Sequence, residues 1–286
     1  MKANQTIHFT KMHGAGNDYI YVYLPENPIA DLEAAAIDWS RYHFAVGSDG
    51  LITIDKSDCA DFEMRIFNND GSEAMMCGNG IRCVGKFVRD HHLTEKDEIT
   101  VNTKSGIKVL RLVSDDEGIV HSARVDMGEP ILQNRSQIAT EDGGMKGGVI
   151  GTKDMRQYRG TFVSMGNPHF VIFVDDISQV ELTAEGPQLE SHPIFPERCN
   201  IEFAQLREDG SIRMRVWERG SGITMACGTG ACATAVAAML NDLTGGRREC
   251  DVEMDGGTLH IEWSEADNHV YMTGPAAVAF EGTINV

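Results

Sequence analysis

The chain repeats part of its own sequence after 150 residues, and Cys77 and Cys227 mark the two copies. The segment MRIFNNDGSEAMMCGNG at 64–80 aligns with MRVWERGSGITMACGTG at 214–230, with identical Met, Arg, Met, Cys, Gly and Gly. A period of this length corresponds to a domain and is far longer than the repeat of a solenoid. The repeat therefore predicts two similarly folded domains, each with one Cys-Gly-x-Gly turn.

Both helix and strand patterns occur along the chain. The segment DLEAAAIDWSRYH at 31–43 predicts a short amphipathic helix. The apolar run FVIFV at 170–174 predicts a strand that is buried on both faces, and the glycines of 141–151 predict a loop. Other apolar patterns predict strands at 107–113, 119–127, 212–217, 258–263 and 270–272.

A helical pattern follows each Cys-Gly-x-Gly turn. The first has an apolar stripe (Ile81, Val84, Phe87 and Val88) opposite a basic one (Arg82, Lys86 and Arg89), so we expect an amphipathic helix there. The second, ACATAVAAML at 231–240, is small or apolar on all sides and predicts a buried helix. Each cysteine thus lies at the start of a helix, where the helix dipole lowers a thiol pKa and favours anions.

Two such thiols, one from each domain, could hold opposite faces of one carbon atom. One would remove a proton as thiolate while the other delivers a proton as thiol, which is what a racemase or epimerase requires. The helix starts at Gly78, Asn79, Gly228 and Thr229 could stabilise the charge that develops on a neighbouring carboxylate. This chemistry needs no metal and no other cofactor.

The charge balance limits the partners. Lys and Arg number 25 against 43 Asp and Glu, which gives a formal net charge of −18. Such a chain does not attract nucleic acid or anionic membranes, so we expect no nucleic acid and no membrane as a partner. The cysteine chemistry described above calls for a small-molecule substrate, and a homodimer is a candidate assembly. Because the N-terminus lacks an apolar export signal, we expect a cytoplasmic protein.

The remaining cysteines have no comparable context. Seven cysteines are an odd number, and no CxxC pair occurs, which favours reduced thiols and no structural metal. We therefore expect packing roles for Cys59, Cys83, Cys199, Cys232 and Cys250.

The motifs closely resemble the diaminopimelate epimerase family. The matching segments are FTKMHGAGNDY (9–19), GSDGLI (47–52), RIFNNDGSEAMMCGNGIRC (65–83), SMGNPHFV (164–171), ERCN (197–200), WERGSGITMACGTGACA (217–233) and YMTGPA (271–276). The resemblance implies an α+β fold of two pseudo-symmetric domains, each a mixed β-barrel-like sheet around a central helix, with the active site in the interdomain cleft. The implied domains are 1–128, onto which the tail 274–286 packs back, and 129–273.

The resemblance also implies the reaction and the site. The reaction is cofactor-independent epimerisation of L,L-2,6-diaminopimelate to the meso form, in lysine and peptidoglycan precursor biosynthesis. Cys77 and Cys227 would be the acid/base pair, while His169 and Glu218 would line the site and tune the cysteine pKa values. The implied substrate contacts are Asn17, Asn68, Gly78, Asn79, Asn167, Asn200, Glu218, Arg219, Gly228 and Thr229.

The chemistry of the substrate fits these assignments, because only one of its two amino-acid ends is epimerised. Arg219 could pair with the distal carboxylate, and Glu218 with the asparagine amides could hold the ammonium group. The sequence departs from some relatives at Gly50, where no side chain is available for contact. Thr229 replaces a serine found in many relatives and retains the hydroxyl.

Three alternatives stay open at this level. The fold and cysteine pair would also suit a racemase for another amino acid, such as histidine or proline. The two cysteines could instead form the reversible disulfide of a redox sensor. A cysteine hydrolase with His13 or His169 as base is the third, although no hydrolase signature is present.

Overall fold

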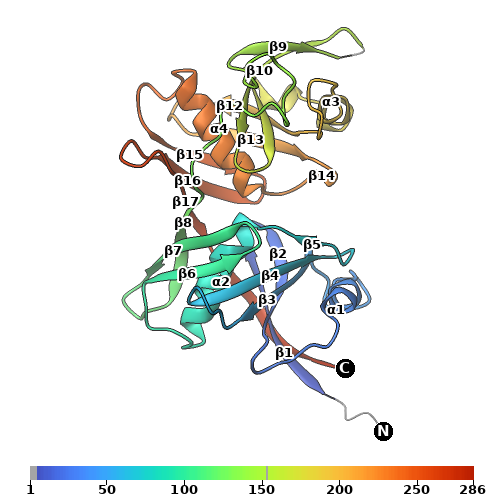
Figure 1. Cartoon of the computed structure of the whole chain (residues 1–286), viewed down its shortest axis with the longest axis vertical. Helices are drawn as coiled ribbons and strands as arrows, with labels where there is room; N and C mark the ends of the chain where they lie inside the picture. The colour runs from blue at the N-terminus through green and yellow to red at the C-terminus, as the bar shows by residue number, and fades with distance from the viewer. Residues whose placement is uncertain (1–4, 153) are drawn as a thin grey trace. The chain divides into compact units, whose positions relative to one another are not determined.

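A computed structural model describes residues 5–152 and 154–286, which form two compact units (Figure 1). The first unit contains residues up to Val125 together with Gly274–Val286, and the second contains Asp126–Thr273. No helix in the part of the chain that the structure describes is both long and apolar enough to span a membrane.

Unit 1 is a mixed sheet with the strand order β18-β1-β2-β3-β4-β6-β7-β8. The pairs β2–β3 and β4–β6 are parallel and the others antiparallel. Its elements are β1 (Thr6–Gly14), β2 (Asn17–Tyr23), α1 (Leu32–Trp39), β3 (Gly50–Asp55), β4 (Phe62–Asn68), β5 (Glu73–Ala74), α2 (Gly78–Asp90), β6 (Glu98–Thr103), β7 (Gly106–Ser114), β8 (Val120–Asp126) and β18 (Ala277–Asn285).

Unit 2 has the same architecture, with the strand order β9-β10-β11-β12-β13-β15-β16-β17. Here β11–β12 and β13–β15 are the parallel pairs. Its elements are β9 (Gly148–Gly151), β10 (Gln157–Ser164), β11 (Pro168–Phe173), the 3₁₀ helix η1 (Ile177–Gln179), α3 (Leu182–Glu190), β12 (Asn200–Leu206), β13 (Ile212–Glu218), β14 (Gly222–Ile223), α4 (Gly228–Leu240), β15 (Glu249–Met254), β16 (Gly257–Trp263) and β17 (Val270–Pro275).

The offset of 150 residues extends far beyond the motif in which it is visible. Helices α2 and α4 begin at Gly78 and Gly228, and strands β4 and β13 begin at Phe62 and Ile212. The parallel pairings match as well, because Tyr19 lies opposite Gly50 on β2 and β3 as His169 lies opposite Asn200 on β11 and β12. The prediction of two similarly folded, pseudo-symmetric α+β halves is confirmed.

Each central helix is surrounded by its own unit (Figure 1). Helix α4 contacts β10, β11, β12, β13, β15 and β16. Its alanines let these strands approach closely, and nearly every residue of the helix is buried, as its composition predicts. Helix α2 packs against β1, β2 and β7.

Helix α2 has the expected amphipathic pattern, but most of its basic side is buried as well. Arg82 is fully buried and Lys86 is 7% exposed, while the side chain of Arg89 is 18% exposed. Lys86 Nζ donates to the Val120 carbonyl at 2.7 Å and pairs with Asp90 at 2.6 Å, which satisfies the buried charge. A helical wheel separates polar from apolar positions, but it does not show that strands will cover both faces.

The other expected elements differ from the structure mainly at their ends. The helix of 31–43 is shorter, with Asp31 as its N-cap accepting from the Ala34 N–H at 3.0 Å. The glycine-rich segment 141–151 is not loop throughout, since 148–151 pairs with β10 as β9. The strands expected at 107–113, 119–127, 170–174, 212–217, 258–263 and 270–272 are all present as β7, β8, β11, β13, β16 and β17.

Candidate active site

The two repeated cysteines have the same backbone conformation at the start of corresponding helices. Cys77 is the N-cap of α2 with φ −131° and ψ 116°, and Cys227 is the N-cap of α4 with φ −123° and ψ 108°. The first N–H groups of a helix have no partner within that helix, so they are directed at whatever lies before it. Each cysteine therefore stands beside a potential anion-binding helix start, at Gly78 in unit 1 and Gly228 in unit 2.

Asn17 contacts the thiol of Cys77 in unit 1. Cys77 is half-buried, and its Sγ donates to Asn17 Oδ1 at 3.2 Å. The amide of Asn17 is oriented by Asp49, whose Oδ2 accepts from Asn17 Nδ2 at 2.6 Å. Asp49 is a residue that the sequence reasoning missed, although it stands in the matched segment GSDGLI.

Tyr19 is a second missed neighbour of Cys77. The residue is 6% exposed, and burial, followed by the charges of Cys77 and Asp49, raises the pKa of its phenol well above the usual range. Tyr19 therefore stays protonated and able to donate. The offset of 150 residues could have identified it, because Tyr19 corresponds to His169.

The side chains of the other predicted residues of unit 1 are held by neighbouring side chains, except at Gly50. Asn68 ends β4 and donates from Nδ2 to Ser72 Oγ at 3.0 Å, while the buried Asn79 accepts from Arg82 Nη2 at 3.0 Å. At Gly50 a Cβ would lie 2.1 Å from the Phe67 carbonyl oxygen. The close approach of β4 therefore requires glycine at this position, and only backbone of Gly50 can take part in a site.

Cys227 lies in a more enclosed setting than Cys77. It is 5% exposed, and its Sγ is 3.5 Å from Thr229 Oγ1. Burial, followed by the carboxylates of Glu218 and Glu202, raises the pKa of the Cys227 thiol well above its usual range. The expectation of a lowered pKa from the helix dipole is therefore wrong for Cys227, because burial and two carboxylates outweigh the dipole.

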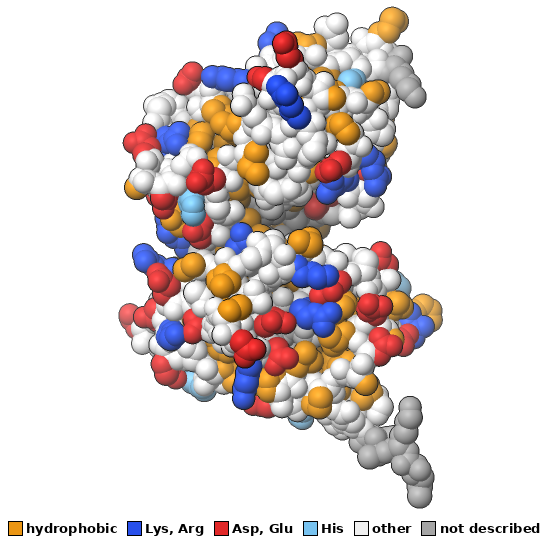
Figure 2. Space-filling model, viewed as in Figure 1, with side chains coloured by type: hydrophobic (Ala, Val, Ile, Leu, Met, Phe, Trp, Pro, Cys, Tyr) orange, Lys and Arg blue, Asp and Glu red, His pale blue; other side chains and the backbone are white. Residues whose placement is uncertain are grey.

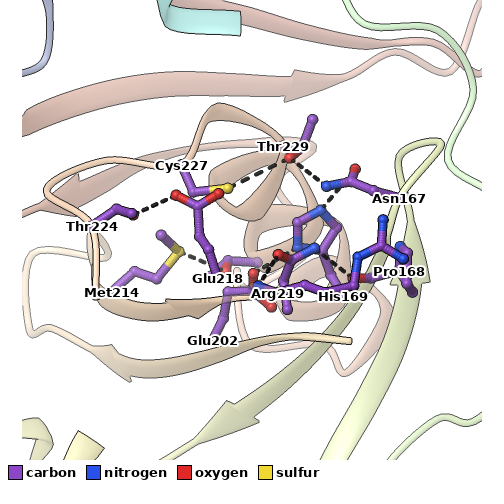
Figure 3. A network of polar contacts seen from close by, with 12 residues as sticks. Asn167, Pro168, His169, Glu202, Met214, Glu218, Arg219, Thr224, Cys227 and Thr229 are labelled. Atoms are coloured by element: carbon purple, nitrogen blue, oxygen red, sulfur yellow. Dashed lines mark hydrogen bonds and ion pairs between the residues drawn. The ribbon is translucent and has the colours of Figure 1, made fainter. Parts of the chain in front are cut away.

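His169 occupies the centre of a polar network in unit 2 (Figure 3). Its Nδ1 is 2.6 Å from Glu202 Oε1, and its Nε2 is 3.1 Å from Asn167 Oδ1. Asn167 Nδ2 in turn donates to Thr229 Oγ1 at 3.3 Å. Both ring nitrogens are engaged by these partners, which removes the support for His169 as the base of a cysteine hydrolase.

Three further predicted residues gather at the end of β13 and the start of β12. Glu218 accepts a short hydrogen bond from Thr224 Oγ1, and Arg219 Nη1 donates to the Glu197 carbonyl at 3.1 Å. The amide of Asn200 is buried between two backbone groups, donating to the Pro168 carbonyl at 2.8 Å and accepting from the Arg219 N–H at 2.9 Å. Asn200 therefore holds the turn that carries Arg219.

In the part of the chain that the structure describes, none of the remaining cysteines forms a disulfide. Cys83, Cys199, Cys232 and Cys250 are buried, as packing residues should be. Cys59 is exposed, so the expectation of a packing role is wrong there. Within residues 5–152 and 154–286 no group of three His, Cys, Asp or Glu side chains is arranged to hold a metal ion.

Comparison with solved structures identifies the fold. A PhzF-family phenazine biosynthesis protein of Bacillus anthracis superposes with a TM-score of 0.70 at 17% identity, over 99% of this chain and 100% of that one. A hydroxyproline epimerase of Agrobacterium vitis gives 0.69 at 14% identity, over 100% and 94%. The face of the molecule drawn in Figure 2 mixes acidic with basic side chains, without a continuous basic area.

Comparison of sequences identifies the family. The model of the diaminopimelate epimerase family matches residues 9–133 and 161–279. A diaminopimelate epimerase of Phocaeicola vulgatus is 60% identical over 281 residues, which cover 98% of this chain and 99% of that protein. One of Bacteroides thetaiotaomicron is 58% identical over 276 residues, which cover 96% and 97%. The chain therefore belongs to the diaminopimelate epimerase family and is an isomerase.

Proposed function

We propose that this chain interconverts L,L- and meso-2,6-diaminopimelate without a cofactor, using Cys77 and Cys227 as a two-base pair. The observation that carries the proposal is the equivalence of the two cysteines, which cap corresponding helices in the same backbone conformation. A reaction that inverts one carbon needs two equivalent acid–base groups, and its reverse needs them with their roles exchanged.

The proposed step moves two protons and no other atoms. The thiolate of one cysteine takes the α-proton, and the electron pair of the C–H bond passes into the adjoining carboxylate. The thiol of the other cysteine gives its proton to the opposite face, so that thiol and thiolate have exchanged places. N–H groups at the starts of α2 and α4 would stabilise the carboxylate as it gains charge.

Differences between the corresponding positions of the two units support recognition of the distal end by unit 2. Asn68 and Asn69 in unit 1 correspond to Glu218 and Arg219 in unit 2. The carboxylate of Glu218 suits an ammonium group, and the planar guanidinium of Arg219 suits a carboxylate. A substrate without a second amino-acid end would leave both charges unpaired, which costs affinity.

The direct test is exchange of the α-proton in deuterated water, followed by NMR with reductant present. We offer L,L-diaminopimelate, L-histidine and L-proline separately, with and without chelator and carbonyl reagents. Exchange with diaminopimelate alone, unaffected by these reagents, is the expected result. Exchange with histidine or proline instead would overturn the substrate, and no exchange under full reduction together with a reversible disulfide would favour the redox sensor.

A second prediction concerns the protonation of Cys227. Because the Glu218 carboxylate raises the pKa of this thiol, Glu218→Gln should lower it, and the thiolate should form at lower pH than in the wild type. The measurement is the rate of iodoacetamide alkylation at Cys227 against pH, resolved by peptide mass spectrometry. Glu253→Gln, which removes a carboxylate paired with Arg207, serves as the control. An unchanged alkylation profile in Glu218→Gln would refute the electrostatic coupling.

A further inference from the structure

His169 and Glu202 form a fully buried pair in unit 2. Both side chains are 0% exposed, and the 2.6 Å contact between Nδ1 and Oε1 is short for a hydrogen bond. The second carboxyl oxygen, Glu202 Oε2, is buried and has no hydrogen-bond partner in the described part of the chain. Burying such a group costs free energy, so the pair needs an explanation beyond packing.

The hydrogen-bond partners determine where the ring protons are. Asn167 Nδ2 donates to Thr229, so Asn167 Oδ1 faces His169 and can only accept. His169 Nε2 must therefore carry a hydrogen. The contact between Nδ1 and Glu202 Oε1 then holds one shared proton, and the pair has no net charge whichever atom the proton is on. Burial raises the pKa of Glu202, and the contact with His169 opposes that shift.

Unit 1 shows that the fold does not require this pair. The residue corresponding to Glu202 is Ile52, which is also fully buried, and the one corresponding to His169 is Tyr19. In both units this side chain lies under the first turn of the central helix. A Cβ at Gly80 would lie 2.5 Å from Ile52 Cδ1, and a Cβ at Gly230 would lie 2.9 Å from Glu202 Oε1. The place that the Glu202 carboxyl group occupies in unit 2 is occupied in unit 1 by the hydrocarbon side chain of Ile52.

We propose that Glu202 is a positioning residue of the reaction, which holds His169 in the Nε2–H form and thereby orients Asn167 and Thr229 around Cys227. Four successive contacts make the connection: Glu202 to His169 at 2.6 Å, His169 to Asn167 at 3.1 Å, Asn167 to Thr229 at 3.3 Å and Thr229 to the Cys227 sulfur at 3.5 Å (Figure 3). Glu202 has no direct hydrogen bond to the Cys227 sulfur in this arrangement, and it acts by fixing the groups that lead to it.

Two substitutions of Glu202 distinguish its hydrogen bond to His169 from its contribution to packing. Glu202→Gln keeps the size and offers an amide N–H to Nδ1, whereas Glu202→Ile inserts the residue that unit 1 uses. The first readout is the long-range ¹⁵N–¹H spectrum of the histidine rings, with the His169 signals identified by their loss in His169→Gln. We expect one Nε2–H ring in the wild type and Glu202→Gln, and loss of that single state in Glu202→Ile.

The second readout is steady-state kinetics with diaminopimelate, and here the inference rests on the proposed function. Glu202→Ile should lower kcat on the order of tenfold with little change in KM, which is the low end of the loss seen when a residue that orients a metal-binding histidine is removed. The kcat of Glu202→Gln should stay within about threefold of the wild-type value. Phe203→Leu, at a neighbouring core position, is the control: it should lower stability and leave the spectrum and kcat unchanged.

The outcomes are distinguishable. A wild-type histidine spectrum in Glu202→Ile would overturn the proposed hydrogen-bond role, and so would an altered spectrum with unchanged kcat, which would make the pair purely structural. If Glu202→Gln lost as much activity as Glu202→Ile, orientation through the hydrogen bond would also be wrong. If the wild type did not act on diaminopimelate, the proposed function would fail, but the spectra would still decide how Glu202 holds His169.

Discussion

Replacement of either Cys77 or Cys227 by serine is expected to lower the rate of epimerisation by about 10²- to 10⁴-fold, the range that positioned acid–base groups contribute. A serine hydroxyl retains most of the shape and the hydrogen-bonding capacity of the thiol. It is a much weaker acid, however, so it cannot serve as a base at neutral pH. The measurement is the rate at which L,L-diaminopimelate becomes the meso form.

Exchange of the α-proton in deuterated water should distinguish the two single cysteine variants from each other. Each single variant retains one thiol, which can still remove and return a proton on its own side of the carbon. We therefore expect each variant to exchange the α-proton of one stereoisomer without inverting it, and the two variants to prefer opposite stereoisomers. Such a pattern would assign one face to each cysteine.

The chain offers matched controls for both positions. Cys59→Ser changes an exposed thiol and Cys250→Ser a buried one, and neither lies in the candidate site. Both should epimerise at the wild-type rate. Near-normal epimerisation in Cys77→Ser or Cys227→Ser would rule out the two-thiol mechanism.

The largest expected effect on stability is that of Arg82→Met. The fully buried guanidinium donates to the carbonyls of Gly78 and Pro275, at 3.0 and 3.2 Å, and to Asn79 Oδ1 at 3.0 Å. Methionine fills similar space without donors, so three hydrogen bonds from a buried charged group are lost, each worth about 1.5–3 kcal/mol. We expect unit 1 to lose about 3 kcal/mol or more of its free energy of unfolding, a large part of what a domain has.

Tryptophan fluorescence can follow this loss in urea. Of the three tryptophans, only Trp39 belongs to unit 1, so a background with Trp217→Phe and Trp263→Phe reports on that unit. Arg111→Met, which breaks an exposed ion pair with Glu98, is the control and should change stability by about 0.5 kcal/mol or less. An unfolding midpoint for Arg82→Met equal to that of Arg111→Met would contradict the role given to Arg82.

Local patterns predicted much of this molecule correctly because the two units repeat them. The helix after each cysteine follows from 3.6-residue periodicity, and the equivalent positions of Cys77 and Cys227 within their units follow from the offset of 150 residues. The same offset would have placed Tyr19 beside Cys77 had it been applied to His169. These features depend on residues that are close together in sequence or related by the repeat.

Features that depend on distant segments were not predictable in this way. The raised pKa of Cys227 comes from burial and from Glu218 and Glu202, which β13 and β12 bring to the start of α4. A charged residue within the apolar strand NIEFAQL is itself unusual, and Glu202 could have been noticed on that ground. Its partner His169 lies 33 residues earlier, and only the register of β11 with β12 brings the two together.

The antiparallel pairing of β18 with β1 has a consequence for the order of folding. Residues 126–273 are continuous in sequence and are all available before 274–286 emerge from the ribosome, so unit 2 can fold first. Unit 1 begins near the N-terminus but cannot be completed until its last strand has been synthesised. The hydrogen bond from Arg82 to the Pro275 carbonyl cannot form before that point. During that interval the edge of β1 that later pairs with β18 is exposed. An exposed strand edge favours aggregation, so the N-terminal part of the nascent chain needs protection until β18 has been synthesised.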